Sequence, residues 1–145
     1  MSRIRILAIA AATAAVLASC ATMPSTYNVD NSRAYNQDYD EVWEKLVQFF
    51  ASRNIPIKNI AKDSGVIYAE ATTFNDDLAD CGTGGLWATF GRRASVNVFV
   101  TRSTEQPRVS VNTEFQEMRR FDANTTTVAC NSKGVIERAV LDALN

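Results

Sequence analysis

The amino-acid sequence predicts a two-layer α+β domain, in which an antiparallel sheet of four to five strands carries N- and C-terminal helices on one face. Apolar residues recur at helical spacing over residues 42–50 and again over 135–144. Between these segments, apolar residues alternate with polar ones, as they do in strands that bury a single face. Because short turns separate the alternating segments, the strands are expected to be antiparallel neighbours.

The first helix is predicted to begin at residues 38–40 and to end near Asn54. Asp38 and Asp40 supply N-cap oxygens and negative charge for the helix start. Pro56 disfavours helical backbone in the residue before it, so the helix must end there. The apolar stripe of this helix consists of Val42, Trp43, Leu46, Val47 and Phe50. This stripe is expected to pack on the sheet.

Two strands are predicted after this helix, over residues 55–61 and 66–73. Residues 62–65 join them as a short hairpin turn, in which Gly65 adopts the positive φ that glycine tolerates. Residues 74–93 then form a long irregular loop that contains Cys81. Its glycines lack the ending of a phosphate-binding loop, and its aspartates lack the spacing of an EF-hand. The loop is therefore expected to be held by its cysteine rather than by a ligand.

A second hairpin is predicted from the alternation of apolar residues in two segments, 94–100 and 109–115. Both apolar sets share one face when the pairs are Val100 with Val111, Val98 with Thr113, and Val96 with Phe115. Residues 104–107 are then the connecting loop. The sheet has one dry face and one wet face, so helices should cover a single side.

The same register brings four arginines together at the open end of the hairpin. These are Arg92, Arg93, Arg119 and Arg120. Such a cluster would bind a phosphate group, a polyanionic glycan or an acidic partner. The alternative is that Glu117, Asp122 and the aspartates of the preceding loop neutralise the arginines locally.

The chain is predicted to close with one more strand and a second helix. Residues 125–130 are rich in β-forming side chains, and Asn131 and Ser132 offer N-cap oxygens for the helix that follows. Its apolar stripe consists of Val135, Ile136, Ala139, Val140, Ala143 and Leu144. This stripe predicts the second helix that covers the sheet.

Residues 1–19 have the pattern of an export signal. A short start with Arg3 and Arg5 precedes an uncharged apolar run over residues 6–16, which is too short to span a bilayer as a permanent helix. The segment closes with Leu17-Ala18-Ser19-Cys20. These four residues resemble the lipobox of bacterial lipoproteins, in which the cysteine is lipidated and becomes the first residue of the mature protein.

The lipoprotein resemblance implies that lipid on Cys20 anchors the chain to a membrane without a transmembrane helix. In that family, aspartate directly after the cysteine favours the inner membrane. This chain has Ala21 there, so the expected location is the outer membrane, facing the periplasm. The expected organisation is a signal peptide over residues 1–19, the lipidated cysteine and a flexible polar tether over 20–37, and a single α+β domain over 38–145.

The order of elements in the domain resembles the helix-grip domains of the C-subunit lipoprotein of the outer-membrane assembly machinery. The resemblance rests on the helix start at residues 39–43 and on the hairpin at residues 62–68. It implies an accessory role in envelope assembly, and it points to no shared site residue.

Removal of residues 1–19 leaves a chain of 126 residues with 13 basic and 16 acidic side chains, a net charge of −3. This charge does not fit nucleic-acid binding, which requires a basic surface. Two cysteines remain in the domain, Cys81 and Cys130. An even pair in an oxidising compartment is expected to form a disulfide.

Enzymatic activity, a cofactor and a metal site are not expected. The chain has no histidine, which is the commonest general base and metal ligand.

One hypothesis is a non-catalytic interaction or accessory module of the cell envelope. Its partners would be the membrane, through the lipid on Cys20, and an envelope protein or anionic envelope component. The other hypothesis is a carrier of a small apolar ligand in a helix-grip cavity. A large apolar cavity would favour the carrier, and a filled core the module.

Overall fold

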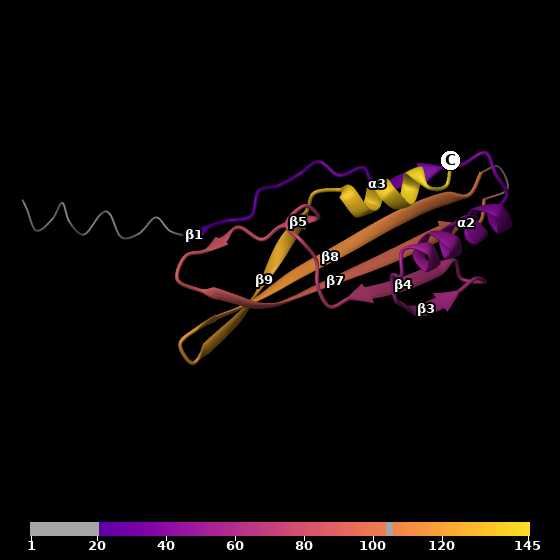
Figure 1. Ribbon diagram of the computed structural model, residues 1–145. Helices are drawn as coiled ribbons and strands as arrows, with labels where there is room; N and C mark the ends of the chain where they lie inside the picture. The colour runs from indigo at the N-terminus through magenta and orange to yellow at the C-terminus, as the bar shows by residue number, and fades with distance from the viewer. Residues whose placement is uncertain (1–20, 104–105) are drawn as a thin grey trace, which may run out of the picture.

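The computed structural model describes residues 21–103 and 106–145 (Figure 1). The predicted signal peptide and Cys20 lie outside the described residues. The elements are, in chain order, β1 (Ala21–Thr22), β2 (Ser32–Ala34), α2 (Tyr39–Ser52), β3 (Ile57–Ala61), β4 (Val66–Ala71), β5 (Ala79–Asp80), β6 (Thr83–Gly84), β7 (Ala88–Thr101), β8 (Arg108–Phe121), β9 (Asn124–Ser132) and α3 (Val135–Asp142). The predicted α+β class is confirmed.

An antiparallel seven-stranded sheet forms the centre of the domain, in the order β3-β4-β7-β8-β9-β5, with β2 also paired to β8. A separate two-stranded sheet joins β1 to β6. The predicted number of four to five strands is therefore wrong, because β2 and β5 also belong to the main sheet. These two strands have three and two residues, which is too short for an alternating pattern to mark them.

The predicted boundaries of the first helix and first hairpin are close to those observed. The Asp38 carboxylate caps α2 by accepting a hydrogen bond of 2.8 Å from the backbone N–H of Glu41. Gly65 has φ 69° in the turn between β3 and β4. A Cβ atom at Gly65 would lie 2.1 Å from the carbonyl oxygen of Val100, so both conformation and space require glycine there.

The predicted register of the second hairpin is wrong by two residues. Val100 lies opposite Val109, not Val111, and Val98 lies opposite Val111. Strand pairing continues as far as Thr101 opposite Arg108. A slip of two residues leaves every side chain on the same face, so the alternation alone cannot distinguish the two registers.

Both helices pack on one face of the sheet, as predicted. One buried cluster joins the apolar stripe of α2 to that of α3 and to the dry face of β4, β7 and β8. Its fully buried members include Leu46, Phe50, Ile67, Val98, Val111 and Leu141. In Figure 1, α2 and α3 cover the right-hand part of the sheet, and the left-hand ends of β7, β8 and β9 extend beyond them.

The sequence predicts that residues 21–37 form a flexible tether. In the structure they instead lie along the surface of the domain. Within this segment β2 pairs with β8, and Tyr35 is buried. The Tyr35 hydroxyl donates a hydrogen bond of 2.6 Å to the backbone carbonyl of Leu141 in α3. The polar composition that indicates a linker also suits an edge strand whose contacts are mainly backbone and hydroxyl hydrogen bonds.

Candidate functional site

The dry face of the sheet becomes polar where β7 and β8 leave the cover of the helices. A second buried cluster, with Phe74, Ala94 and Phe115, continues the core in this direction. Beyond it on the same face come Arg92 of β7 and Glu117 of β8, which lie directly opposite each other. Glu117 is 3% exposed, so this part of the sheet carries a buried charge.

Two arginines hold the Glu117 carboxylate, one on each oxygen. The Nε of Arg92 donates to Oε2 over 2.9 Å, and the Nε of Arg119 donates to Oε1 over 2.7 Å. Arg92 also contacts Asp76, with an N–O distance of 2.7 Å. Arg119 is buried and donates to the backbone carbonyl of Cys81 over 2.7 Å. The two arginines thus connect the Glu117 carboxylate of the sheet to the loop that precedes β7.

The pKa of Glu117 lies below the ordinary value of a glutamate. Burial disfavours the charged form and acts to raise the pKa, but the hydrogen bonds from Arg119 and Arg92 outweigh it. A carboxylate whose pKa is lower in the folded than in the unfolded protein stabilises the fold above the unfolded pKa. That stabilisation is lost as the pH falls through the folded pKa.

We therefore expect the difference in free energy of unfolding between the wild type and Glu117→Gln to depend on pH. The difference is expected to be fully present above about pH 4.3, the pKa of an unfolded glutamate, and to shrink as the pH falls below that value. Urea unfolding at a series of pH values measures it. A difference that stays constant over this range would contradict a role for the ionised carboxylate.

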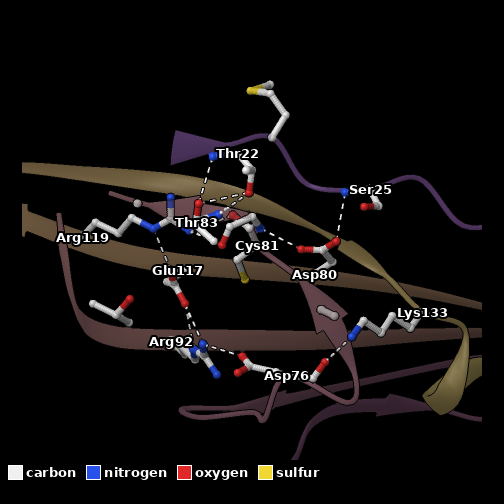
Figure 2. A pocket seen from close by; sticks show the side chains of 15 residues that line it. Thr22, Ser25, Asp76, Asp80, Cys81, Thr83, Arg92, Glu117, Arg119 and Lys133 are labelled. Atoms are coloured by element: carbon white, nitrogen blue, oxygen red, sulfur yellow. Dashed lines mark hydrogen bonds and ion pairs between the residues drawn. The ribbon is translucent and has the colours of Figure 1, made fainter. Parts of the chain in front are cut away.

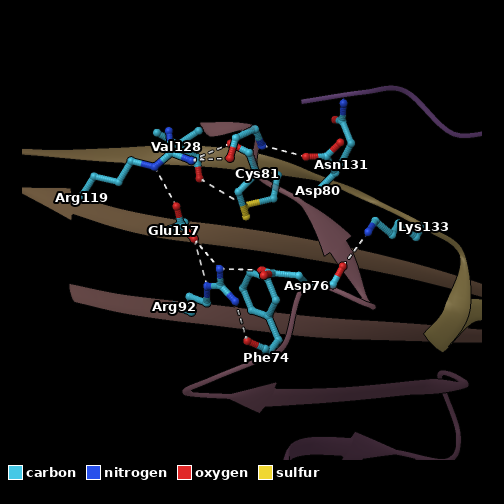
Figure 3. Close-up of a disulfide and its surroundings, with 12 residues drawn as sticks. Phe74, Asp76, Asp80, Cys81, Arg92, Glu117, Arg119, Val128, Asn131 and Lys133 are labelled. Atoms are coloured by element: carbon cyan, nitrogen blue, oxygen red, sulfur yellow. Dashed lines mark hydrogen bonds and ion pairs between the residues drawn. A yellow bond between two sulfur atoms is a disulfide. The ribbon is translucent and has the colours of Figure 1, made fainter. Parts of the chain in front are cut away.

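The predicted disulfide joins Cys81 to Cys130 (Figure 3), with a Cα–Cα distance of 4.1 Å. The pairing of β5 with β9 places Asp80 opposite Asn131. The next antiparallel pair along these strands is Cys81 with Cys130, which explains why the two Cα atoms are so close. The disulfide therefore holds the loop of residues 74–87 against β9.

A polar pocket of about 570 Å³ opens beside the disulfide (Figure 2). It lies between the loop, the N-terminal segment and the exposed end of the dry face. Its charged lining residues are three cations and three carboxylates: Arg92, Arg119, Lys133, Asp76, Asp80 and Glu117. Because these charges balance, the pocket suits a ligand with hydrogen-bond donors and acceptors better than a strongly charged one.

Asp80 fixes the N-terminal segment over this pocket. Its carboxylate accepts hydrogen bonds from the backbone N–H of Gly82 over 2.8 Å and of Ser25 over 3.0 Å. These two hydrogen bonds hold the pKa of Asp80 below its ordinary value, and the one from Gly82 has the larger effect. The side chain of Asn131 donates to the Ser25 carbonyl over 2.9 Å. Residues near Ser25 thus form one wall of the pocket.

The structure does not bring the four predicted arginines together. Arg92 and Arg119 lie on the dry face, where both bind Glu117. Arg93 is opposite Gln116 on the other face, and the Arg120 guanidinium lies 5.8 Å from the ring centre of Phe90. The first physical reason is that consecutive strand residues point to opposite faces, which separates Arg92 from Arg93 and Arg119 from Arg120. The second is the two-residue change of register. It places Arg92 opposite Glu117 rather than opposite Arg119, which replaces a like-charge pair with an ion pair.

Sequence reasoning names Glu117 and the loop aspartates as neutralising groups, but it misses the pocket that they line. The missed residues are Ser25 and Lys133, which come from the predicted tether and from the residues before the last helix. Lys133 donates from Nζ to the backbone carbonyl of Asp76 over 2.6 Å. One signal was present in the sequence, because pairing Arg92 with Glu117 satisfies both charges across the two strands.

No protein-family model matches the chain, and no curated protein is significantly similar to it. Within residues 21–103 and 106–145, neither helix combines the length and the apolar character that crossing a membrane requires.

Proposed function

We propose that this protein is a lipid-anchored lipoprotein of the outer membrane that faces the periplasm and acts as a non-catalytic interaction module of the cell envelope. The observation that carries the proposal is the order of segments in residues 3–20. Basic, apolar and small residues follow one another and end at Cys20, as in a lipobox. Two acyl chains or more on that cysteine make membrane attachment stable.

The disulfide supports the proposed compartment. Cys81 and Cys130 are both buried and bonded to each other, and such bridges persist in oxidising environments such as the periplasm. The arrangement of two helices on one face of an antiparallel sheet is similar to helix-grip domains. That similarity supports an accessory role in envelope assembly.

The pocket supports an interaction module over an apolar carrier. A carrier needs an enclosed cavity lined by apolar side chains. The pocket of about 570 Å³ is instead open and lined by six charged side chains. The helix-covered face is filled by large side chains such as Phe50 and Leu46, which are completely buried. A protein segment with exposed backbone and polar side chains is the ligand that this lining fits best.

The lipid anchor is tested by Cys20→Ser in the full chain. The variant is expected to remain unprocessed or to be released from the outer membrane, because serine cannot form the thioether to lipid. Membrane fractionation and intact mass measure the result. Ser19→Ala is the matched control, since it keeps a small residue before the cysteine. A Cys20→Ser protein that matures and stays in the outer-membrane fraction would refute the proposal.

The interaction surface is tested by photo-crosslinking in intact cells. A crosslinking side chain at Thr89, which lines the pocket, is expected to capture a specific envelope protein. The same side chain at Asn59, an exposed residue of the edge strand β3, is the control. Identical crosslinking patterns at the two positions would count against the pocket as the binding surface.

A further inference from the structure

Exposed apolar side chains gather at one end of the molecule. In the described part of the chain, eight large apolar residues are exposed. Four of them are Met23 (88% exposed), Leu86 (80%), Phe90 (53%) and Phe121 (45%). Trp87 joins this group, with its ring centre 5.9 Å from that of Phe121. We call these five residues the apolar tip.

Three chain segments meet at the apolar tip. Ala21 of β1 pairs with Gly84 of β6, and Ala88 of β7 pairs with Arg120 of β8. A turn over residues 84–87 connects β6 to β7, and the N–H of Trp87 closes it by donating to the Gly84 carbonyl over 3.1 Å. In Figure 1 this end lies at the left, where β7 begins and the β8–β9 hairpin projects away from both helices.

The folded domain does not use the apolar tip as core. Leu86 and Phe90 belong to neither of the two buried clusters. Phe90 lies where the pairing of β7 with β8 is shifted by a bulge, and bulges redirect a side chain outward. Large apolar side chains that are exposed together at one end of a domain mark a site where a protein or a membrane binds.

The position of Ala21, the first residue that the structure describes, favours a membrane as the binding partner of the apolar tip. Ala21 lies at the apolar tip through its pairing with Gly84, and Cys20 is joined to Ala21 by one peptide bond. Cα atoms across a peptide bond are about 3.8 Å apart, so lipid on Cys20 would hold the bilayer at this end of the domain. A protein partner has no comparable covalent link to the tip.

The composition of the apolar tip also fits the interface of a bilayer. Tryptophan is enriched at this depth because its ring is apolar and its N–H is polar, and segments that lie in the interface bury tryptophan, phenylalanine and leucine side chains there. The Arg120 guanidinium beside the Phe90 ring can reach lipid phosphate. The acidic residue nearest to Arg120 in the sequence is Asp122. It lies in the exposed turn of the β8–β9 hairpin and is expected to stay in water.

We infer that the apolar tip is a second membrane contact, which inserts into the lipid interface beside the anchor and fixes how the domain stands on the bilayer. This inference rests on the proposed lipid anchor at Cys20. With only a flexible anchor, the domain could take any orientation. With the tip inserted, the polar pocket is held close to the membrane surface, because Met23 of the tip also lines the pocket.

Tryptophan quenching tests the inference. The chain has two tryptophans, Trp43 and Trp87, and Trp43 is 5% exposed in the core. The lipidated protein, purified from membranes, is reconstituted into phosphatidylethanolamine–phosphatidylglycerol vesicles whose acyl chains are brominated near the headgroup or near the methyl end. In a Trp43→Phe background, Trp87 is expected to be quenched most strongly by bromine near the headgroup.

A second comparison removes the dependence on Trp43→Phe, which alters the core. The difference in fluorescence between the wild type and Trp87→Phe gives the quenching of Trp87 with Trp43 in place. The buried Trp43 is expected to be shielded from bromine in both proteins.

Phe90→Ser and Phe99→Ser form a matched pair for the contribution of apolar side chains, because both residues are exposed phenylalanines of β7. Leu86→Ser combined with Phe90→Ser is expected to shift the equilibrium from inserted to detached tip by about tenfold or more, since full burial of either side chain is worth at least one decade. Phe99→Ser, at the far end of β7, is expected to leave quenching unchanged.

The outcomes separate this inference from the proposed function. Intact mass of the same preparation reports lipid on Cys20. Lipidated protein with unquenched Trp87 would overturn the membrane contact, leave the anchor intact, and indicate that a protein covers the tip. Headgroup-depth quenching that the Leu86→Ser/Phe90→Ser variant loses supports the membrane contact. If Cys20 carried no lipid but Trp87 were still quenched, the proposed lipid anchor would be refuted, and the apolar tip would bind the membrane without it.

Discussion

Reduction of the Cys81–Cys130 disulfide is expected to lower the free energy of unfolding by up to about 4 kcal/mol. The bridge joins residues 49 positions apart, and in the chain-entropy description a loop of this length strongly restricts the unfolded chain. The sulfurs also belong to the buried cluster with Phe74 and Phe115, so reduction disturbs packing as well. Urea unfolding with and without a thiol reductant measures the effect.

The Cys81→Ser/Cys130→Ser double variant provides the control for the disulfide. Without the bridge, its unfolding midpoint is expected to match that of the reduced wild type and to be insensitive to reductant. A wild-type midpoint that reduction leaves unchanged would show that the bridge contributes nothing to stability. Both cysteines must be replaced, because a single substitution leaves a reactive thiol in the protein.

Glu117→Leu is expected to destabilise the domain by about 3 kcal/mol, because it leaves a buried positive charge without its carboxylate. Arg119 is 7% exposed and would keep only its hydrogen bonds to backbone carbonyls. Arg92 loses less, since it keeps Asp76 as an ion-pair partner. Urea unfolding at neutral pH measures the loss.

Two further variants isolate the cause. Glu114→Leu changes an exposed carboxylate of the same strand and is expected to alter stability by no more than about 0.5 kcal/mol. Glu117→Leu combined with Arg119→Leu is expected to be more stable than Glu117→Leu alone, because the unpaired charge is removed as well. If Glu117→Leu cost no more than Glu114→Leu, the buried ion pairs would not stabilise the fold.

The features that the sequence predicts correctly are those with local physical causes. The start of α2 follows from the Asp38 carboxylate, and the turn at Gly65 from the positive φ that glycine allows. The apolar stripes predict which faces of the helices are buried, because apolar residues at helical spacing form the face that packs on the core. The disulfide follows from an even number of domain cysteines, without knowledge of the strands that bring them together.

The candidate site could not be predicted because it depends on non-local pairing. The register of β7 with β8 decides whether Arg92 meets Glu117 or Arg119, and the apolar alternation is blind to a shift of two residues. The wall formed by Ser25 depends on hydrogen bonds to Asp80, far along the chain. Such backbone contacts leave no pattern in the polar segment that makes them.

The pairing of β1 and β2 with later strands has a consequence for the order of folding. β1 pairs with β6, and β2 pairs with residues 108–110 of β8. These first strands therefore cannot pair until their partner strands, which come much later in the sequence, have been synthesised. Contacts between distant residues close large loops and slow folding. Residues 21–34, which follow the proposed export signal and Cys20, therefore have no strand partner while the chain is still short. For the export that we propose, this segment remains unpaired until its partner strands have been made, and an unpaired chain is the form that a narrow translocation channel accepts.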